Sequence, residues 1–134
     1  MQYATADLRT TRILVVEDDS ILRMFIVDGL REVGYQVEAV ATAAEALGKL
    51  RDNDEGFDGA VIDYGLPDRR GDVLAAELRK INGDLPMVIA SGYHEDMLRG
   101  RFSPDGRTVL LSKPYDGRQL RKALDQLGIS PLEQ

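Results

Sequence analysis

Short, unbroken apolar runs alternate along this chain with stretches of helical periodicity. The run ILVV at residues 13–16 leads directly into three carboxylates, Glu17, Asp18 and Asp19. Runs of this length indicate strands that are buried on both faces, as in a parallel sheet with helices on either side. Three further runs of the same character end at Asp63, Ser91 and Lys113. We therefore expect an α/β fold in which most strands end in a polar side chain.

Helical patterns fill the intervals between these strands. The predicted helices cover residues 20–33, 42–51, 72–81 and 116–127, and a weaker edge strand covers 35–40. Gly34 and Gly128 stand where helices are expected to end, Thr42 and Glu45 form a capping box, and Asp116 is a predicted cap. The segment 92–107 is less regular, and we expect a short, mobile helix there. Five strands alternating with helices indicate a three-layer, doubly wound parallel sheet.

Composition excludes several classes of protein. The 134 residues suit one domain with a buried core, and the absence of cysteine excludes disulfides and thiolate metal sites. The net charge of −6 argues against binding of a nucleic-acid backbone. The apolar runs are too short to span a bilayer, and the N-terminus lacks the pattern of a signal peptide. We expect a cytoplasmic protein without a nucleic-acid or membrane partner.

The polar strand ends predict a metal site. Carboxyl ends of parallel strands meet at one edge of a sheet, so Glu17, Asp18 and Asp63 are expected to lie close together. Clustered carboxylates repel one another unless a cation lies among them, and oxygen ligands favour Mg²⁺ or Ca²⁺. An alternative is that the first two acids only cap the following helix and interact with its dipole. Asp19 is expected either to cap that helix or to face solvent.

The same edge has the groups needed for phosphoryl transfer. A carboxylate beside Mg²⁺ can attack phosphorus and form an aspartyl phosphate, which makes Asp63 a candidate nucleophile. Lys113 and Ser91 could then donate hydrogen bonds to the phosphoryl oxygens. Each residue also has a simpler interpretation: a strand-end acid, an exposed lysine before a proline, and a hydroxyl at the start of a loop.

Four segments carry a family resemblance. ILVVEDD, AVIDYGLPDRRG, PMVIASGY and LLSKPY occur in the order and spacing of a two-component response-regulator receiver domain of the CheY-like superfamily. The resemblance covers about residues 12–127 and implies a flavodoxin-like sheet with strand order 2-1-3-4-5. It divides the chain into an N-terminal extension (1–11), a receiver domain (12–128) and a tail or linker start (129–134).

The resemblance also implies specific roles for the site residues. Asp63 would be the phosphoacceptor, Ser91 the switch hydroxyl and Lys113 the phosphate-binding lysine, joined to Pro114 by a cis peptide bond. The implied Mg²⁺ ligands, with Mn²⁺ or Ca²⁺ as possible substitutes, are Glu17, Asp18, Asp63 and the backbone carbonyl of Gly65.

The implied function is that of a phosphorelay switch, not an enzyme with a separate substrate. A histidine kinase or histidine phosphotransfer protein would donate the phosphoryl group, docking near the first helix at Leu22, Phe25 and Ile26. The output would act on a target protein or a fused output domain. Two alternatives stay open: a pseudo-receiver that acts by contact alone, and a Mg²⁺-dependent phosphohydrolase. Such hydrolases typically carry a second Asp two residues after the nucleophile, where this chain has Gly65.

Three positions depart from the usual receiver pattern. Leu110 replaces the aromatic residue that often rotates on activation, and Gly65 and Tyr93 occupy positions that influence dephosphorylation. The ASGY motif resembles an atypical alphaproteobacterial group, although the spacing of its Tyr differs by one, and a hybrid-kinase receiver is also open. We expect switching to reorder residues 92–108 instead of rotating an aromatic side chain.

Overall fold

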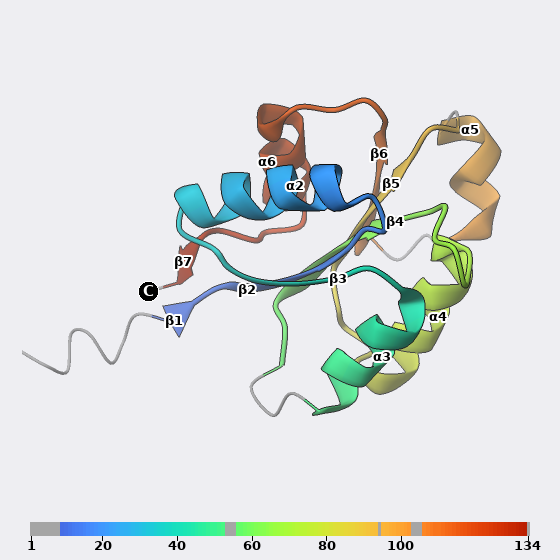
Figure 1. Cartoon of the computed structure of the whole chain (residues 1–134), viewed down its shortest axis with the longest axis horizontal. Coiled ribbons are helices and arrows are strands. Elements are labelled where there is room, and N and C mark those ends of the chain that lie inside the picture. The colour runs from blue at the N-terminus through green and yellow to red at the C-terminus, as the bar shows by residue number, and fades with distance from the viewer. Residues whose placement is uncertain (1–8, 53–55, 94, 103–105, 134) are drawn as a thin grey trace, which may run out of the picture.

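The computed structural model describes residues 9–52, 56–93, 95–102 and 106–133. Its centre is a five-stranded parallel sheet with the order β3-β2-β4-β5-β6 (Figure 1). The strands are β2 (Arg12–Val16), β3 (Gln36–Val40), β4 (Gly59–Asp63), β5 (Met87–Ser91) and β6 (Thr108–Ser112). When these five strands alone are numbered in chain order, their order in the sheet is 2-1-3-4-5, which confirms the predicted fold.

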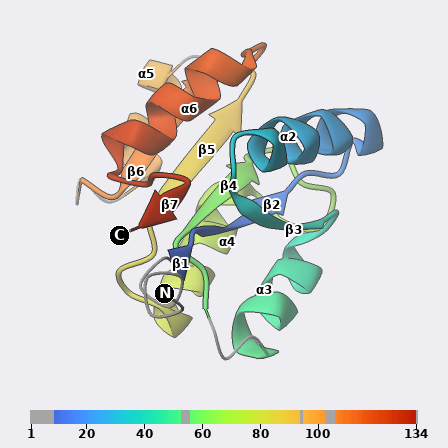
Figure 2. The ribbon, with the colours of Figure 1, turned by 90° about the vertical axis from the view of Figure 1, so that its left-hand side faces the viewer.

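Helices cover both faces of the sheet. The helices are α2 (Ser20–Glu32), α3 (Ala43–Asp52), α4 (Gly71–Ile81), α5 (Glu95–Leu98), the 3₁₀ turn η1 (Arg99–Arg101) and α6 (Gly117–Gln126). Helices α2 and α6 lie over one face, and α3 and α4 over the other (Figures 1 and 2). The described residues of the segment 92–107 form the short elements α5 and η1, so the predicted short helix is confirmed. Its mobility stays a prediction, and residues 94 and 103–105 lie outside the described part of the chain.

The strands supply side chains to two separate cores. Leu14 and Val16 pack on the side of α3 and α4, whereas Ile13 and Val15 pack with α2 and α6. All four side chains are fully buried. Because successive residues of a strand point to opposite faces, an unbroken apolar run is what a sheet covered on both sides requires.

One prediction about α2 is wrong. Ile26 is buried and Leu22 is half-buried, so both belong to the packed side of the helix. The apolar side chains that α2 exposes are Ile21, Met24 and Phe25, at 80%, 64% and 56% of their surface. The sequence contained more apolar positions than one stripe needs, but it did not show which of them face the sheet.

Helix ends follow the predicted signals. Asp19 is the N-cap of α2, accepting hydrogen bonds from the backbone N–H groups of Ile21 (3.0 Å) and Leu22 (3.1 Å). The cap therefore comes from the third acid of the run, which leaves the first two for another role. Asp116 caps α6 in a full capping box with Gln119.

A second, two-stranded sheet joins the two ends of the described chain. Strand β1 (Arg9–Thr10) pairs antiparallel with β7 (Leu132–Glu133). The backbone N–H of Thr11 donates to the Pro131 carbonyl at 3.2 Å, and the Thr11 hydroxyl donates to the Ser130 carbonyl. Strands of two residues have no periodicity to detect, so this pairing was not predicted. The division of the chain at residues 12 and 128 stays a prediction.

Within the described residues, none of the helices combines the length and the apolar character that a bilayer-spanning helix needs.

Candidate functional site

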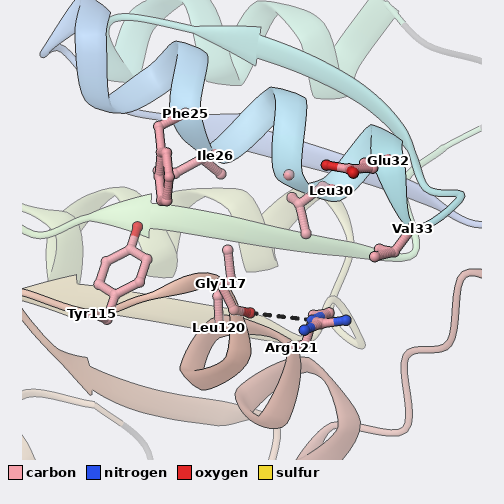
Figure 3. Close-up of a pocket in the computed structure, with 10 residues that line it drawn as sticks. Phe25, Ile26, Leu30, Glu32, Val33, Tyr115, Gly117, Leu120 and Arg121 are labelled. Carbon is pink, nitrogen blue, oxygen red and sulfur yellow. Dashed lines mark hydrogen bonds between the residues drawn. The ribbon is translucent and has the colours of Figure 1, made fainter.

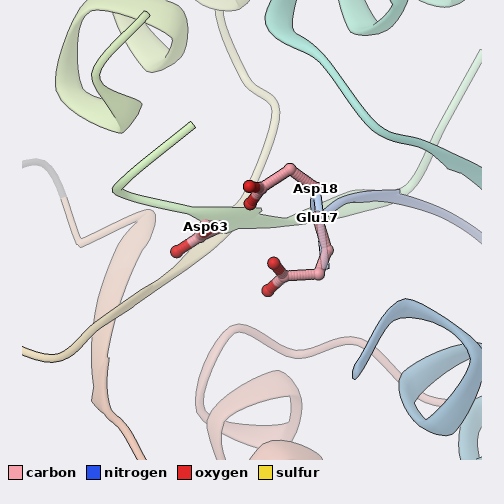
Figure 4. A group of neighbouring side chains, drawn as sticks. All are labelled: Glu17, Asp18 and Asp63. Carbon is pink, nitrogen blue, oxygen red and sulfur yellow. The ribbon is translucent and has the colours of Figure 1, made fainter. Parts of the chain in front are cut away.

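Three carboxylates meet at the carboxyl edge of the sheet, where β2 and β4 end side by side. Glu17, Asp18 and Asp63 each place one oxygen within 4.8 Å of the others (Figure 4). Glu17 and Asp63 are buried, at 3% and 7% exposure, and Asp18 is exposed. The cluster therefore has a closed side within the protein and an open side facing solvent.

Lys113 supplies the positive charge of the site. Its Nζ donates to Oδ1 of Asp63 at 2.9 Å and to Oε1 of Glu17 at 3.4 Å. Lys113 directly follows β6, and its backbone N–H donates to the Ser91 carbonyl at 2.8 Å. The Lys113–Pro114 peptide bond is cis, as the resemblance implied. Burial disfavours the ammonium form, but the hydrogen bond that Lys113 donates to Asp63 and the charges of both acids outweigh burial and raise the pKa of Lys113.

Glu17 is the acid whose protonation is most altered by the fold. Burial raises the pKa of Glu17 to about 7, and the neighbouring charge of Asp63 adds to this effect. The backbone N–H of Asp19, which donates to Oε2 at 3.1 Å, and the ammonium of Lys113 act in the opposite direction. A buried carboxylate beside a second one is costly in the charged form, so this site favours either a proton or a cation.

Ser91 and Gly65 flank the carboxylate of Asp63. Strand β4 pairs Asp63 with Ala90, which places Ser91 one residue further along the neighbouring strand. The buried Ser91 Oγ accepts a hydrogen bond from the backbone N–H of Tyr93 at 2.9 Å. The exposed Gly65 donates its N–H to Oδ1 of Asp63 at 3.3 Å. Among the described residues, no hydrogen bond reaches Oδ2 of Asp63, which leaves that oxygen open.

Two further side chains near the acidic cluster were not predicted. Arg23 on α2 donates from one guanidinium nitrogen to the carbonyls of Glu17 (2.8 Å) and Asp18 (3.4 Å), which holds the acidic turn against the helix. Tyr115 has a buried hydroxyl that makes no hydrogen bond within the part of the chain described here. Burial, followed by the charges of Glu17 and Asp63, raises the pKa of Tyr115. A basic residue one turn into a helix after an acidic run could have indicated Arg23, whereas Tyr115 had no such signal.

The donor set fits a hard divalent cation. Carboxylate oxygens from two adjacent strand ends are ligands that Mg²⁺ and Ca²⁺ prefer, and the exposed Asp18 side leaves room for water. Within the described residues the cluster consists of carboxylates, without the histidine or cysteine that softer metals favour.

Comparison with known proteins identifies the family. A family model described as the response regulator receiver domain matches residues 13–125. The chain belongs to this family. Receiver domains are modules of two-component signalling and not classical enzymes, and the sheet order above is that of the CheY-like, flavodoxin-like fold.

Relatives of this receiver domain occur both alone and within larger proteins. Sensor kinase CckA of Brucella abortus (strain 2308) is 32% identical over 127 residues, which are 95% of this chain and 13% of CckA. The response regulator receiver protein CpdR of the same organism is 29% identical over 119 residues, 89% of this chain and 98% of CpdR. The crystal structure of a response regulator receiver protein from Sinorhizobium medicae WSM419 is 29% identical, with a TM-score of 0.80 over 89% of this chain and 94% of that one.

Three aromatic side chains, Tyr64, Tyr93 and Phe102, are connected by ring contacts beyond the ends of β4 and β5. Leu110 on β6 is partly buried against the core. The ring of Tyr64, directly after Asp63, makes edge contacts with Tyr93 (6.0 Å between centroids) and Phe102 (6.5 Å). Aromatic contact therefore connects the residue after Asp63 with the segment that follows Ser91.

Proposed function

We propose that this receiver domain accepts a phosphoryl group on Asp63 from a partner phosphohistidine and thereby changes its interaction surface. The observation that carries the proposal is the buried Asp63 carboxylate, with Lys113 on Oδ1 and with Oδ2 open among the described residues. A carboxylate held in this way can react at one oxygen while the other stays fixed.

The transfer uses the residues as follows. Oδ2 of Asp63 attacks phosphorus and forms the O–P bond, and the P–N bond to the partner imidazole breaks with its electron pair going to nitrogen. Lys113 stays near both the carboxylate and the incoming phosphoryl oxygens and offsets their charge. Glu17, Asp18, Asp63 and the carbonyl of Gly65 would hold Mg²⁺. When bound, the ion would neutralise the acids and the phosphoryl oxygens.

We expect the output to depend on Ser91 and the segment 92–108. A phosphoryl oxygen on Asp63 would accept a hydrogen bond from the Ser91 hydroxyl, and movement of that side chain toward the phosphoryl group would weaken the hydrogen bond that Ser91 Oγ now accepts from the Tyr93 N–H. The Tyr64 contacts with Tyr93 and Phe102 would then carry the change toward α5 and η1. The altered surface, formed by α5, β6 and α6, would engage a target protein or a fused output domain.

We propose that the phosphohistidine partner docks on α2. The exposed side chains Ile21, Met24 and Phe25 begin two residues after the Asp19 cap, so a partner seated on them is next to the acidic cluster. A cavity of about 530 Å³ continues this surface between α2 and α6, with Phe25, Leu30 and Val33 on one side and Tyr115 and Leu120 on the other (Figure 3). The relative CckA is named a sensor kinase, which supports a partner of the two-component class.

Phe25→Asp is expected to slow phosphotransfer from a phosphohistidine donor by about tenfold or more, because a charge at the centre of an apolar interface is costly. The rate at which acetyl phosphate phosphorylates the Phe25→Asp variant should differ by less than about twofold from wild type, since Phe25 is not a member of the acidic cluster. The measurement is the rate of label transfer from purified phosphotransfer proteins. Val73→Asp is the matched control, because it puts the same charge on an exposed position of α4, on the opposite face of the sheet. Equal slowing by both variants would argue against docking on α2.

The proposed function is tested by a titration of Mg²⁺ and then beryllofluoride, followed by amide NMR. We expect Mg²⁺ to shift the amides of Asp18 and Gly65, and beryllofluoride to extend the shifts from Ser91 into described residues of 92–108. Acetyl phosphate should add one phosphoryl mass when Mg²⁺ is present. Absence of both the shifts and the added mass, with the fold intact, would contradict the proposal and favour a pseudo-receiver.

A further inference from the structure

We propose that Asp68 is a positioning residue for the phosphoacceptor site, because it anchors the loop after Asp63 to the first turn of α3. The inference rests on the proposed function and concerns how the Gly65 carbonyl is held in place. Asp68 lies in the loop 64–70, between β4 and α4, and its side chain does not join the acidic cluster.

Both carboxylate oxygens of Asp68 bind another element of the fold. Oδ1 accepts from the backbone N–H of Ala43 at 2.9 Å, and Oδ2 accepts from Ala44 at 3.0 Å. These are the first two N–H groups of α3, which have no partner inside the helix. The hydrogen bond from Ala43, with that from Ala44, lowers the pKa of Asp68. The loop is therefore joined to two residues of α3, Ala43 and Ala44, which precede Asp68 by 25 and 24 positions in the chain.

The base of the same loop is also fixed. The N–H of Gly71 donates to the Tyr64 carbonyl at 2.7 Å, and Gly65 forms a bridge with Arg70. A Cβ atom on Gly71 would lie 2.7 Å from the Cα of Tyr64, so only glycine allows this closure. The loop thus has one attachment at its base and a second at Asp68.

Gly65 lies between the Tyr64–Gly71 hydrogen bond at the base of the loop and the attachment at Asp68. It is exposed, has no side chain of its own to pack, and its backbone N–H donates a long hydrogen bond of 3.3 Å to Oδ1 of Asp63. A backbone carbonyl binds a cation well only when the surrounding chain holds its direction. Without Asp68 the loop would keep its base but lose its contact with α3, and the Gly65 carbonyl would sample more orientations.

A plain helix cap is the competing explanation, and α3 provides a control for it. Thr42 is the other cap of this helix, since its Oγ accepts from the Glu45 N–H at 3.2 Å. Thr42→Ala removes a cap from α3 without touching the loop after Asp63. Asp68→Ala removes a cap and also the anchor. A role limited to capping predicts the same behaviour for both variants.

The experiment compares Asp68→Ala, Asp68→Asn and Thr42→Ala with the wild-type domain. Two quantities are measured: the Mg²⁺ dissociation constant, from a titration followed by amide NMR, and the hydrogen-exchange rates of the Gly65 and Gly71 amides. We expect Asp68→Ala to raise the dissociation constant about tenfold and to speed exchange at Gly65 by a similar factor of about ten. Asp68→Asn, which keeps a neutral acceptor, should show a smaller change in both. Thr42→Ala should leave both within about twofold of wild type.

Equal effects of Thr42→Ala and Asp68→Ala, or no effect of Asp68→Ala on either quantity, would overturn the proposal. If Asp68→Ala does not fold, Asp68→Asn decides by the same two measurements. If the wild-type domain binds no Mg²⁺, the proposed function fails, and exchange at Gly65 still decides whether Asp68 holds the loop.

Discussion

Asp63→Asn is expected to abolish the phosphoryl adduct that acetyl phosphate forms with the wild-type receiver domain. An amide nitrogen or neutral amide oxygen cannot attack phosphorus as a carboxylate does, and the substitution keeps the size and shape of the side chain. The β4 backbone and its pairing with β5 should be unaffected, since asparagine fits the same strand-end position. Intact mass after incubation with acetyl phosphate and Mg²⁺ measures the adduct, and amide NMR confirms that the fold is retained.

Asp58→Asn is the matched control for this result. Asp58 directly precedes β4, at the end of the strand opposite Asp63, and its carboxylate accepts from the Arg12 backbone N–H at 2.8 Å. The control makes the same chemical change at the other edge of the sheet and should keep the adduct. A phosphoryl adduct that persists in Asp63→Asn, mapped by peptide mass to another acid, would assign the phosphoacceptor elsewhere.

Glu17→Gln is expected to stabilise the domain at about pH 8 in the absence of divalent cations and to have little effect at about pH 5. The pKa of Glu17 rises from 4.5 to about 7 on folding. Between these values the folded state binds more protons than the unfolded state, so stability falls as pH rises through this interval and stays lower above it. Glutamine does not titrate, so the Glu17→Gln variant does not lose stability in this way. The expected gain in its free energy of unfolding at about pH 8 is on the order of 2 kcal/mol.

Urea unfolding at both pH values, with a chelator present, measures this difference. Glu32→Gln, which removes an exposed carboxylate from the last turn of α2, controls for the change in net charge. Saturating Mg²⁺ at about pH 8 should stabilise the wild-type domain and have less effect on Glu17→Gln, because a ligand that binds only the folded state raises its stability. A Glu17→Gln domain that is less stable than wild type at about pH 8 would mean that the Lys113 contact outweighs the cost of burying the charge.

Sequence patterns predicted the elements whose cause is local. Residues 13–16 had to form a strand buried on both faces, because four successive apolar side chains alternate between two covered faces. The rule that parallel strands align their carboxyl ends then brought Glu17, Asp63 and Lys113 to one edge, and the structure places them within hydrogen-bond or metal-ligand distance. Their chemical roles stay predictions that the variants above test.

Other features were decided only by the packing of distant segments. The contact of Asp68 with Ala43 and Ala44 joins the loop after β4 to the first turn of α3, which is remote in the chain, so no local pattern could predict it. The pairing of β1 with β7 likewise depends on where the two ends arrive. The direction of the α2 apolar surface was misjudged because an excess of apolar residues does not show which stripe the sheet covers. Periodicity and strand-end chemistry are properties of neighbouring residues and are visible in the sequence, whereas contacts between separate elements exist only once those elements have packed.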